Sequence, residues 1–296
     1  MDYRRSLILR PGARHSVNDS ATHDQLFDLL AITGADRAAC SRLLGGDVDQ
    51  AAVAEAKSSL TSRLGSYSEE PLDASTTDPM AWLTAYLQLT PTIVSWHRDL
   101  GVPTEVTNTT LADVGRNLAI HRRAHAEFGL ETWDWLISHY TGMMFALGRL
   151  NFMLHPTKET IDGVMAPGDW VPGIHIPESG PLTPQLVDAS LAQAKEFFAT
   201  YFADKPVAVA VCVTWLLDPY LVKHMPANSN IGSFVRRFTP MGQLTDSQTE
   251  ALFFLFRTRD LNRLNTLPRD TMLQRFALDR AAAGQPWQTG SGYIRL

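Results

Sequence analysis

The sequence predicts an α+β fold in which a helical N-terminal part precedes a mixed sheet flanked by helices. Three observations predict it. Apolar residues recur at helical spacing through most of the first 140 residues, an unbroken β-branched run covers 207–217, and an amphipathic helix pattern covers 184–202 between strand-like segments. With 296 residues, the chain can bury one large core or two smaller ones. We place the boundary between a helical domain, 1–141, and a second domain, 142–296.

The first half contains five segments with helical periodicity and one polar loop. Gly45-Gly46 is typical of a turn between the first two helices, and the polar loop at 66–78 contains Pro71 and is followed by Pro79. We expect Thr109 or Thr110 to cap the fourth helix. The predicted helices cover 20–33, 47–63, 80–96, 107–128 and 130–139.

The second half alternates between strand-like and helical patterns. The clearest strand lies between Pro206 and Pro219, and the clearest helix begins at Pro184. After the last helix we expect only a glycine-rich terminal piece. The predicted strands cover 143–154, 169–176, 207–217, 231–238 and 251–257, and the predicted helices cover 184–202 and 269–283.

Composition excludes several classes of function. The formal net charge is -5, whereas proteins that hold long nucleic-acid tracts are usually basic, so we expect no DNA partner. Cys40 and Cys212 are far apart and form no CxxC pair. The apolar run within residues 1–10 is too short for a signal peptide, and no stretch reaches the roughly 18 apolar residues of a membrane span. We therefore expect a soluble cytoplasmic protein with no membrane partner.

Polar groups that could do chemistry gather where segment 169–176 passes into helix 184–202. Pro177 ends the strand, and Thr183 followed by Pro184 is a helix start whose free N–H groups can bind an anion. His175 and Glu178 can serve as general bases, and Asp218 follows the next strand. Each has a structural alternative: the helix is simply well capped, His175 is a hydrogen-bonded core residue, and Asp218 caps the helix that follows.

Several spaced blocks of the sequence form a recognisable series: 110–116 (TLADVGR), 147–150 (LGRL), 175–184 (HIPESGPLTP), 212–219 (CVTWLLDP), 229–231 (SNI) and 267–271 (LPRDT). These blocks resemble signature segments of a bacterial family of GNAT-like acyltransferases that have a helical N-terminal domain and a GNAT-like C-terminal domain. The resemblance covers roughly residues 80 to 296, with the blocks in the order that the family shows.

The resemblance implies a sheet that splays between the strand ending at His175 and the strand beginning near Val207. An acyl donor, usually a coenzyme A thioester, would lie in that split as a co-substrate, and no bound cofactor is expected. His175 or Glu178 would be the base, and Asp218 would orient or bind an amine-type small-molecule acceptor. The donor would contact Ser179, Gly180, Thr183, Thr214, Trp215, Ser229, Asn230 and Arg236.

The loop at 177–183 departs from the usual GNAT pyrophosphate loop, which is basic and glycine-rich. It has one glycine, no basic residue, a carboxylate and two prolines that lack N–H donors. Two alternatives therefore stay open: an aminoacyl transferase that uses aminoacyl-tRNA as donor, or a non-catalytic binding protein that keeps the fold. The arginines at 236–237 and between 257 and 280 would bind the phosphates of either donor, although most are expected in surface ion pairs.

No other motif in the sequence supports a different enzyme class better than acyl transfer. The sequence has no GxSxG, GxxxxGK[ST] or GxGxxG. His121 and His125 share a helix face at a spacing known from zinc sites, but no carboxylate stands where a zinc protease needs it. We expect no metal.

Overall fold

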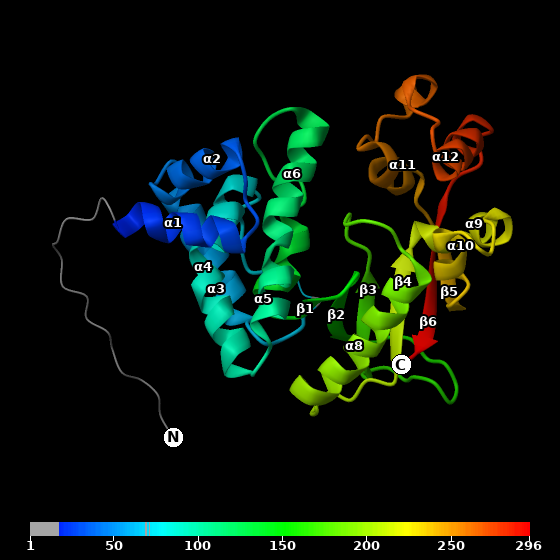
Figure 1. Ribbon diagram of the computed structural model, residues 1–296, viewed down its shortest axis with the longest axis horizontal. Helices are drawn as coiled ribbons and strands as arrows, with labels where there is room; N and C mark the ends of the chain where they lie inside the picture. Colours follow the sequence, from blue (N-terminus) through cyan, green and yellow to red (C-terminus); the bar gives the residue numbers. More distant parts are fainter. Residues whose placement is uncertain (1–17, 69, 71) are drawn as a thin grey trace.

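The computed structural model describes residues 18–68, 70 and 72–296, so residues 1–10, from which we expect no signal peptide, lie outside the described residues. A helical N-terminal part stands beside a six-stranded mixed sheet, as the α+β prediction requires (Figure 1). The helices of the first part are α1 (Asn18–Leu29), α2 (Ala35–Leu44), α3 (Gln50–Ser62), α4 (Pro79–Asp99), α5 (Thr104–Leu111), α6 (Asp113–His125), the short 3-10 helix η1 (Asp134–Leu136) and α7 (Ile137–Tyr140).

Helix α4 is the centre of the helical part. It begins because the Asp78 carboxylate accepts a hydrogen bond from the Met80 N–H, and Pro79 occupies a position that needs no donor. Trp82 and Tyr86 are fully buried, and the Tyr86 hydroxyl donates to the Trp133 carbonyl at 2.7 Å. The helices thus share an apolar core of their own.

Two details of the helical prediction were wrong. Helix α2 was not predicted, and the single helix expected over 107–128 is two helices that meet at Ala112. Thr109 and Thr110 cap neither of them, because both hydroxyls donate to carbonyls one turn back within α5. Thr110 is buried and also accepts the Ala146 N–H at 2.9 Å, which ties α5 to the sheet.

The sheet has the order β1-β2-β3-β4-β6-β5, and only the β3–β4 pair is parallel. The expected mixed sheet is therefore confirmed. Its strands are β1 (Met144–Leu147), β2 (Leu150–Pro156), β3 (Trp170–His175), β4 (Val209–Thr214), β5 (Thr239–Asp246) and β6 (Gln288–Arg295).

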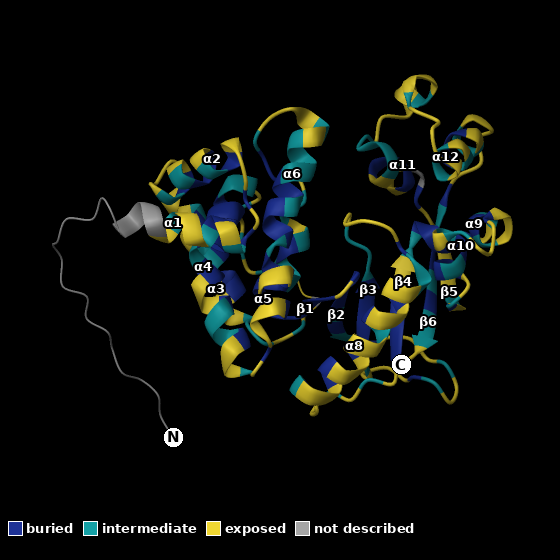
Figure 2. Cartoon of the chain, in the orientation of Figure 1, coloured by how far each residue is buried: buried dark blue, intermediate teal, exposed yellow. Residues whose placement is uncertain are grey.

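Helix α8 (Pro184–Tyr201) covers one face of this sheet. Its apolar side chains, including Val187 and Phe198, share a core with Phe152 and Ile174 of β2 and β3. Figure 2 shows α8 with its outer side exposed over a buried sheet centre. Because side chains alternate along a strand, Gly173 and His175 point to the opposite face from Ile174. His175 is the polar side chain that β3 places on that opposite face.

The C-terminal third differs most from the prediction. Segments 231–238 and 251–257, expected as strands, are the helices α10 (Asn230–Val235) and α11 (Gln248–Phe256). Strand β6 was expected as an irregular tail. It is a strand because its glycines allow close packing: a Cβ at Gly290 would lie 2.6 Å from the Leu217 carbonyl oxygen. The remaining elements are the 3-10 helix η2 (Trp215–Leu217), α9 (Pro219–His224), the 3-10 helix η3 (Leu261–Thr266) and α12 (Met272–Ala282).

Among the residues that the structure describes, no helix has both the length and the apolar character needed to cross a bilayer.

Candidate active site

The sheet separates between β3 and β4. These strands share one register pair, Gly173 with Val211, and one bridge nearer their beginnings, Trp170 with Val207. Beyond that pair the two strands share no further register partners and are paired only with β2 and β6, respectively, although the Cys212 thiol still donates to the Ile174 carbonyl at 3.6 Å. The two strands therefore diverge toward His175 and Thr214, as expected, and leave a split at the carboxyl ends of two parallel strands.

His175 stands at this split. Its Nε2 atom is buried and has no hydrogen-bond partner in the described chain, and neither has the amide nitrogen of its register partner Asn151. Burial lowers the pKa of His175 to about 4, with a further lowering from His139 and His155. The imidazole is therefore neutral at pH 7 and has an unused nitrogen.

Trp135, from η1, holds the His175 ring in place. The two rings meet edge to face with their centroids 4.7 Å apart. The Trp135 indole N–H donates to Oδ2 of the buried Asp113 at 2.8 Å, and His139 Nε2 lies 3.1 Å from the same oxygen. Burial raises the pKa of Asp113, but contacts with His139 and Arg116 outweigh it and hold this pKa below the usual range. A permanent carboxylate thus anchors the indole that packs on His175.

Arg149, in the β1–β2 turn, organises the loop that follows β3. Its guanidinium donates to the carbonyls of Pro177, Gly180 and Pro181 at 3.0, 2.8 and 3.1 Å. Burial lowers the pKa of Arg149. Gly180 has a φ of 79°, which favours glycine at this bend, and the Thr183 hydroxyl accepts the Leu186 N–H to begin α8. The loop is therefore held in one shape by a cation inside it.

Glu178 lies on the outer side of that loop and forms two ion pairs. Its carboxylate contacts Arg123 of α6 at 3.0 Å and also Arg257, the residue that ends α11. A third ion pair joins Glu131, from the loop after α6, to Arg259. These contacts connect the helical part to the C-terminal third across the region of the split.

Asp218 has a structural environment. It is 1% exposed, caps α9 by accepting the Tyr220 N–H at 2.7 Å, accepts the Gln288 N–H at 2.9 Å, and pairs with Arg280 at 3.2 Å. Its two oxygens are occupied by these partners, so we leave Asp218 out of the proposed chemistry.

The remaining donor-binding candidates fall into two groups, those on the loop beside His175 and those with structural contacts elsewhere. Ser179, Gly180 and Thr183 lie on the loop beside His175. The others mostly stabilise the segment after β4: the Thr214 hydroxyl accepts the Leu216 N–H, Trp215 is buried, the Ser229 hydroxyl accepts the Gly232 N–H, Asn230 is the first residue of α10, and Arg236 binds three backbone carbonyls.

A cavity of about 300 Å³ is lined in part by Trp135, the ring that packs on His175, while His175 itself is not among the lining residues. Trp135, Ile137, Met143 and Met153 form its apolar part, and Arg63, Ser66, Tyr67, Ser68, Asp134, Ser138 and Thr141 complete the lining. Met153 is the register partner of Gly173, so this wall belongs to the strand beside β3. A second hollow of about 530 Å³ is an open depression on α3 alone and contains none of these groups.

Sequence reasoning placed His175 but missed the residues that position it. Trp135, Asp113 and Arg149 come from segments 26 to 62 residues away, and only the resemblance blocks 110–116 and 147–150 pointed toward two of them.

Comparisons with known proteins agree with this geometry. The model of the N-acyltransferase N-terminal domain matches residues 21–142, and the model of the GNAT-like C-terminal domain matches residues 144–294. No curated protein matches the chain significantly.

Solved acyltransferase structures are similar over most of the chain. One, in complex with decanoyl-CoA and teicoplanin, has a TM-score of 0.81 and 26% identity, covering 93% of this chain and 87% of that one. A mutant in complex with octanoyl-CoA has a TM-score of 0.80 and 25% identity, covering 93% and 88%. A complex with decanoyl-CoA has a TM-score of 0.80 and 28% identity, with the same coverage. None of them is described as a tRNA complex, so the aminoacyl-tRNA alternative gains no support.

The two family models together span nearly all of the described chain, and the GNAT-like one alone matches more than half of its length. The chain belongs to the GNAT-like acyltransferases that carry an N-acyltransferase N-terminal domain before a GNAT-like C-terminal domain.

Proposed function

We propose that the protein transfers an acyl group from acyl-coenzyme A to an amine-type acceptor, with His175 as the general base. The observation that carries this proposal is the buried, unpartnered Nε2 of His175 at the split between β3 and β4. The similar structures that hold decanoyl-CoA or octanoyl-CoA support the donor. They also include one with teicoplanin, a glycopeptide, so the acceptor is an amine on a small molecule or on a glycopeptide.

The reaction requires one base and no covalent intermediate. The acceptor nitrogen attacks the thioester carbonyl, a C–N bond forms, and the C–S bond breaks. Nε2 of His175 takes the proton that the nitrogen loses, and the resulting imidazolium returns a proton to the departing coenzyme A thiolate. A neutral imidazole is needed, and burial supplies it by keeping the pKa of His175 near 4.

The loop at 177–183 would hold the diphosphate of the donor through backbone N–H groups. In a trans peptide the C=O and N–H point to opposite sides. Because Arg149 draws the Pro177 and Pro181 carbonyls toward itself, the N–H groups of Glu178 and Leu182 point away from it. Together with the Gln185 N–H in the first turn of α8, these groups supply anion donors even though the loop has no basic residue. Ser179, Gly180 and Thr183 remain our donor-binding candidates.

The cavity beside Trp135 would receive the acceptor. Trp135 forms part of its wall and also contacts His175, so the cavity and the base share this one ring as a neighbour. Its lining combines an apolar wall with Arg63 and Asp134, which suits a polar molecule that carries an amine. Donor and acceptor would then approach His175 from different directions, which is the arrangement that direct transfer requires.

Glu178 is not the base in this proposal, because it is half exposed and held by two arginines.

We keep the proposed domain boundary between residues 141 and 142, although α5 already contributes Val106 to the core of the sheet.

Calorimetry with decanoyl-CoA, followed by detection of free thiol when amines are added, tests the function. Saturable binding at one site per chain and amine-dependent thiol release are expected. Absence of binding heat at millimolar decanoyl-CoA would remove the donor from the proposal, and thiol release that is independent of the amine would remove the acceptor class.

A further inference from the structure

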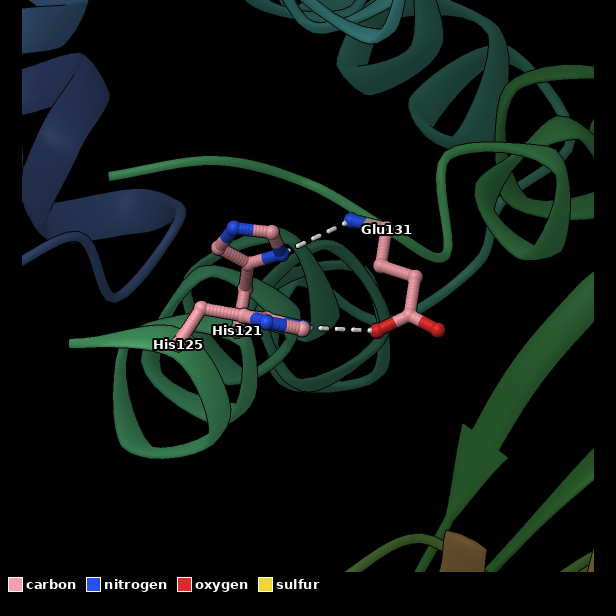
Figure 3. Close-up of side chains that lie close together, drawn as sticks. All are labelled: His121, His125 and Glu131. Atoms are coloured by element: carbon pink, nitrogen blue, oxygen red, sulfur yellow. Dashed lines mark hydrogen bonds and ion pairs between the residues drawn. The ribbon is translucent and has the colours of Figure 1, made fainter. Parts of the chain in front are cut away.

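Two histidines on α6 and a carboxylate from the loop after it come together on the surface of the helical part. His121 and His125 are one turn apart, with ring centroids 4.4 Å apart. Glu131 Oε2 lies 3.0 Å from His125 Nε2, and the Glu131 N–H donates to His121 Nδ1 at 3.2 Å (Figure 3). The three side chains each offer one ligand atom, and these atoms lie within 4.8 Å of one another.

We propose that His121, His125 and Glu131 form a binding site for a divalent transition metal, with zinc as the first candidate. Two imidazoles and one carboxylate are a common zinc ligand set, and a fourth position is left for water. At metal–ligand distances of about 2.0–2.2 Å, tetrahedral ligands stand roughly 3.4 Å apart, so only small side-chain rotations are required. Magnesium and calcium prefer all-oxygen sites and do not fit two imidazoles.

The carboxylate that closes the site is one that sequence spacing did not reveal. Glu131 follows His125 by six residues, beyond the end of α6, and reaches it only because the chain reverses in between. Gly129 lies against the ring in this reversal: a Cβ there would lie 2.2 Å from His121 Nε2, so the imidazole would have to move. The loop is thus built around His121.

The surrounding charges leave room for a cation. Arg122 and Arg123, which lie between His121 and His125 in the sequence, are paired with Asp36 and Glu178, respectively. Arg259 binds Oε1 of Glu131, which leaves Oε2 facing His125. Outer contacts of this kind orient ligands in metal sites. His121 Nδ1 accepts the Glu131 N–H, so it carries a lone pair that a metal can take in place of that hydrogen bond.

A metal at this position would fasten the loop at 126–133 to α6. The same loop leads into η1, where Trp135 packs on His175, and its Glu131 contacts Arg259 of the C-terminal third. The metal would therefore have a structural role: it would stabilise the segment that positions Trp135 and take no part in acyl transfer.

Zinc binding to the full-length, tag-free protein, measured by competition with a chromophoric chelator, tests the site. We expect one zinc per chain and a higher melting temperature with zinc. Cobalt in its place should give the intense visible absorption of a tetrahedral site. His125→Ala and Glu131→Gln should each weaken zinc binding at least about tenfold. The matched control is His224→Ala, an exposed histidine on α9 outside the cluster.

Because both altered side chains are partly or fully exposed, circular dichroism should show an unchanged fold. The proposal is overturned if the wild-type chain binds no stoichiometric zinc, if neither variant weakens binding, or if His224→Ala weakens it equally. Those results would leave the cluster as an ion pair that joins α6 to its loop.

Discussion

Acidification should destabilise the protein through His97, a fully buried residue near the end of α4. Its Nδ1 lies 3.1 Å from the Thr107 hydroxyl, its Nε2 has no partner in the described chain, and its ring packs against Phe145 of β1. Burial lowers the pKa of His97 to about 4, with His139 adding to the effect. Between pH 4 and 6.5 the folded state therefore binds fewer protons than the unfolded state, and stability rises with pH.

The magnitude follows from the two pKa values. With about 6.5 unfolded and about 4 folded, His97 should remove about 2 kcal/mol of unfolding free energy between pH 7.5 and pH 5. His97→Asn keeps a polar group near Thr107 but cannot titrate. It should be less stable at pH 7.5, because a buried ring is lost, and should lose about 2 kcal/mol less than the wild type on acidification.

Urea unfolding followed by tryptophan fluorescence at pH 7.5, 6 and 5 measures both proteins. His175 and other groups contribute equally to the two, so the difference between the slopes isolates His97. Parallel pH dependences, within about 0.5 kcal/mol, would show that the folded pKa of His97 is not lowered and would refute the reasoning.

Three further predictions concern the site and the packing around it. Arg149→Met should raise KM for acyl-CoA about tenfold with little change in kcat, because the loop at 177–181 loses its cation; an unchanged KM in steady-state assays would contradict this. Gly115→Ala should reduce the unfolding free energy by about 2 kcal/mol or more, since a Cβ would lie 2.2 Å from the Ala31 carbonyl oxygen; wild-type stability in urea would disprove that clash. Glu178→Gln should keep kcat within about threefold and make the melting temperature less sensitive to salt, as expected for exposed ion pairs; a hundredfold loss of kcat would instead identify Glu178 as the base.

The centre of the fold could be predicted because its patterns are unambiguous. The run that forms β4 is rich in β-branched residues and fits only a strand, and the capped, amphipathic pattern of α8 fits only a helix. Pro177 marks the end of β3. Short apolar runs such as the one in α11 have no readable period, so strand and helix cannot be distinguished there. Strand β6 has glycines where a strand pattern expects side chains, and only tertiary neighbours explain them: Leu217 lies against Gly290 and Phe238 against Gly292.

The residues of the candidate site could likewise be predicted from the sequence only in part. His175 is found from a local signal, the strand end before Pro177. Its supports are not local: Trp135 reaches it through a separate 3-10 helix, and Asp113 acts through the indole N–H. Asp218 follows a strand as a catalytic residue would, but only its three partners identify it as a cap. Such contacts depend on the tertiary fold and leave no mark in spacing.

The role of His175 is tested most directly by His175→Gln in the acyl-transfer assay, together with acyl-CoA binding to the same variant. If Nε2 is the base, kcat should fall at least about 100-fold, while the dissociation constant for decanoyl-CoA stays within about twofold of the wild-type value. Retention of more than about a third of the wild-type kcat would contradict the assignment.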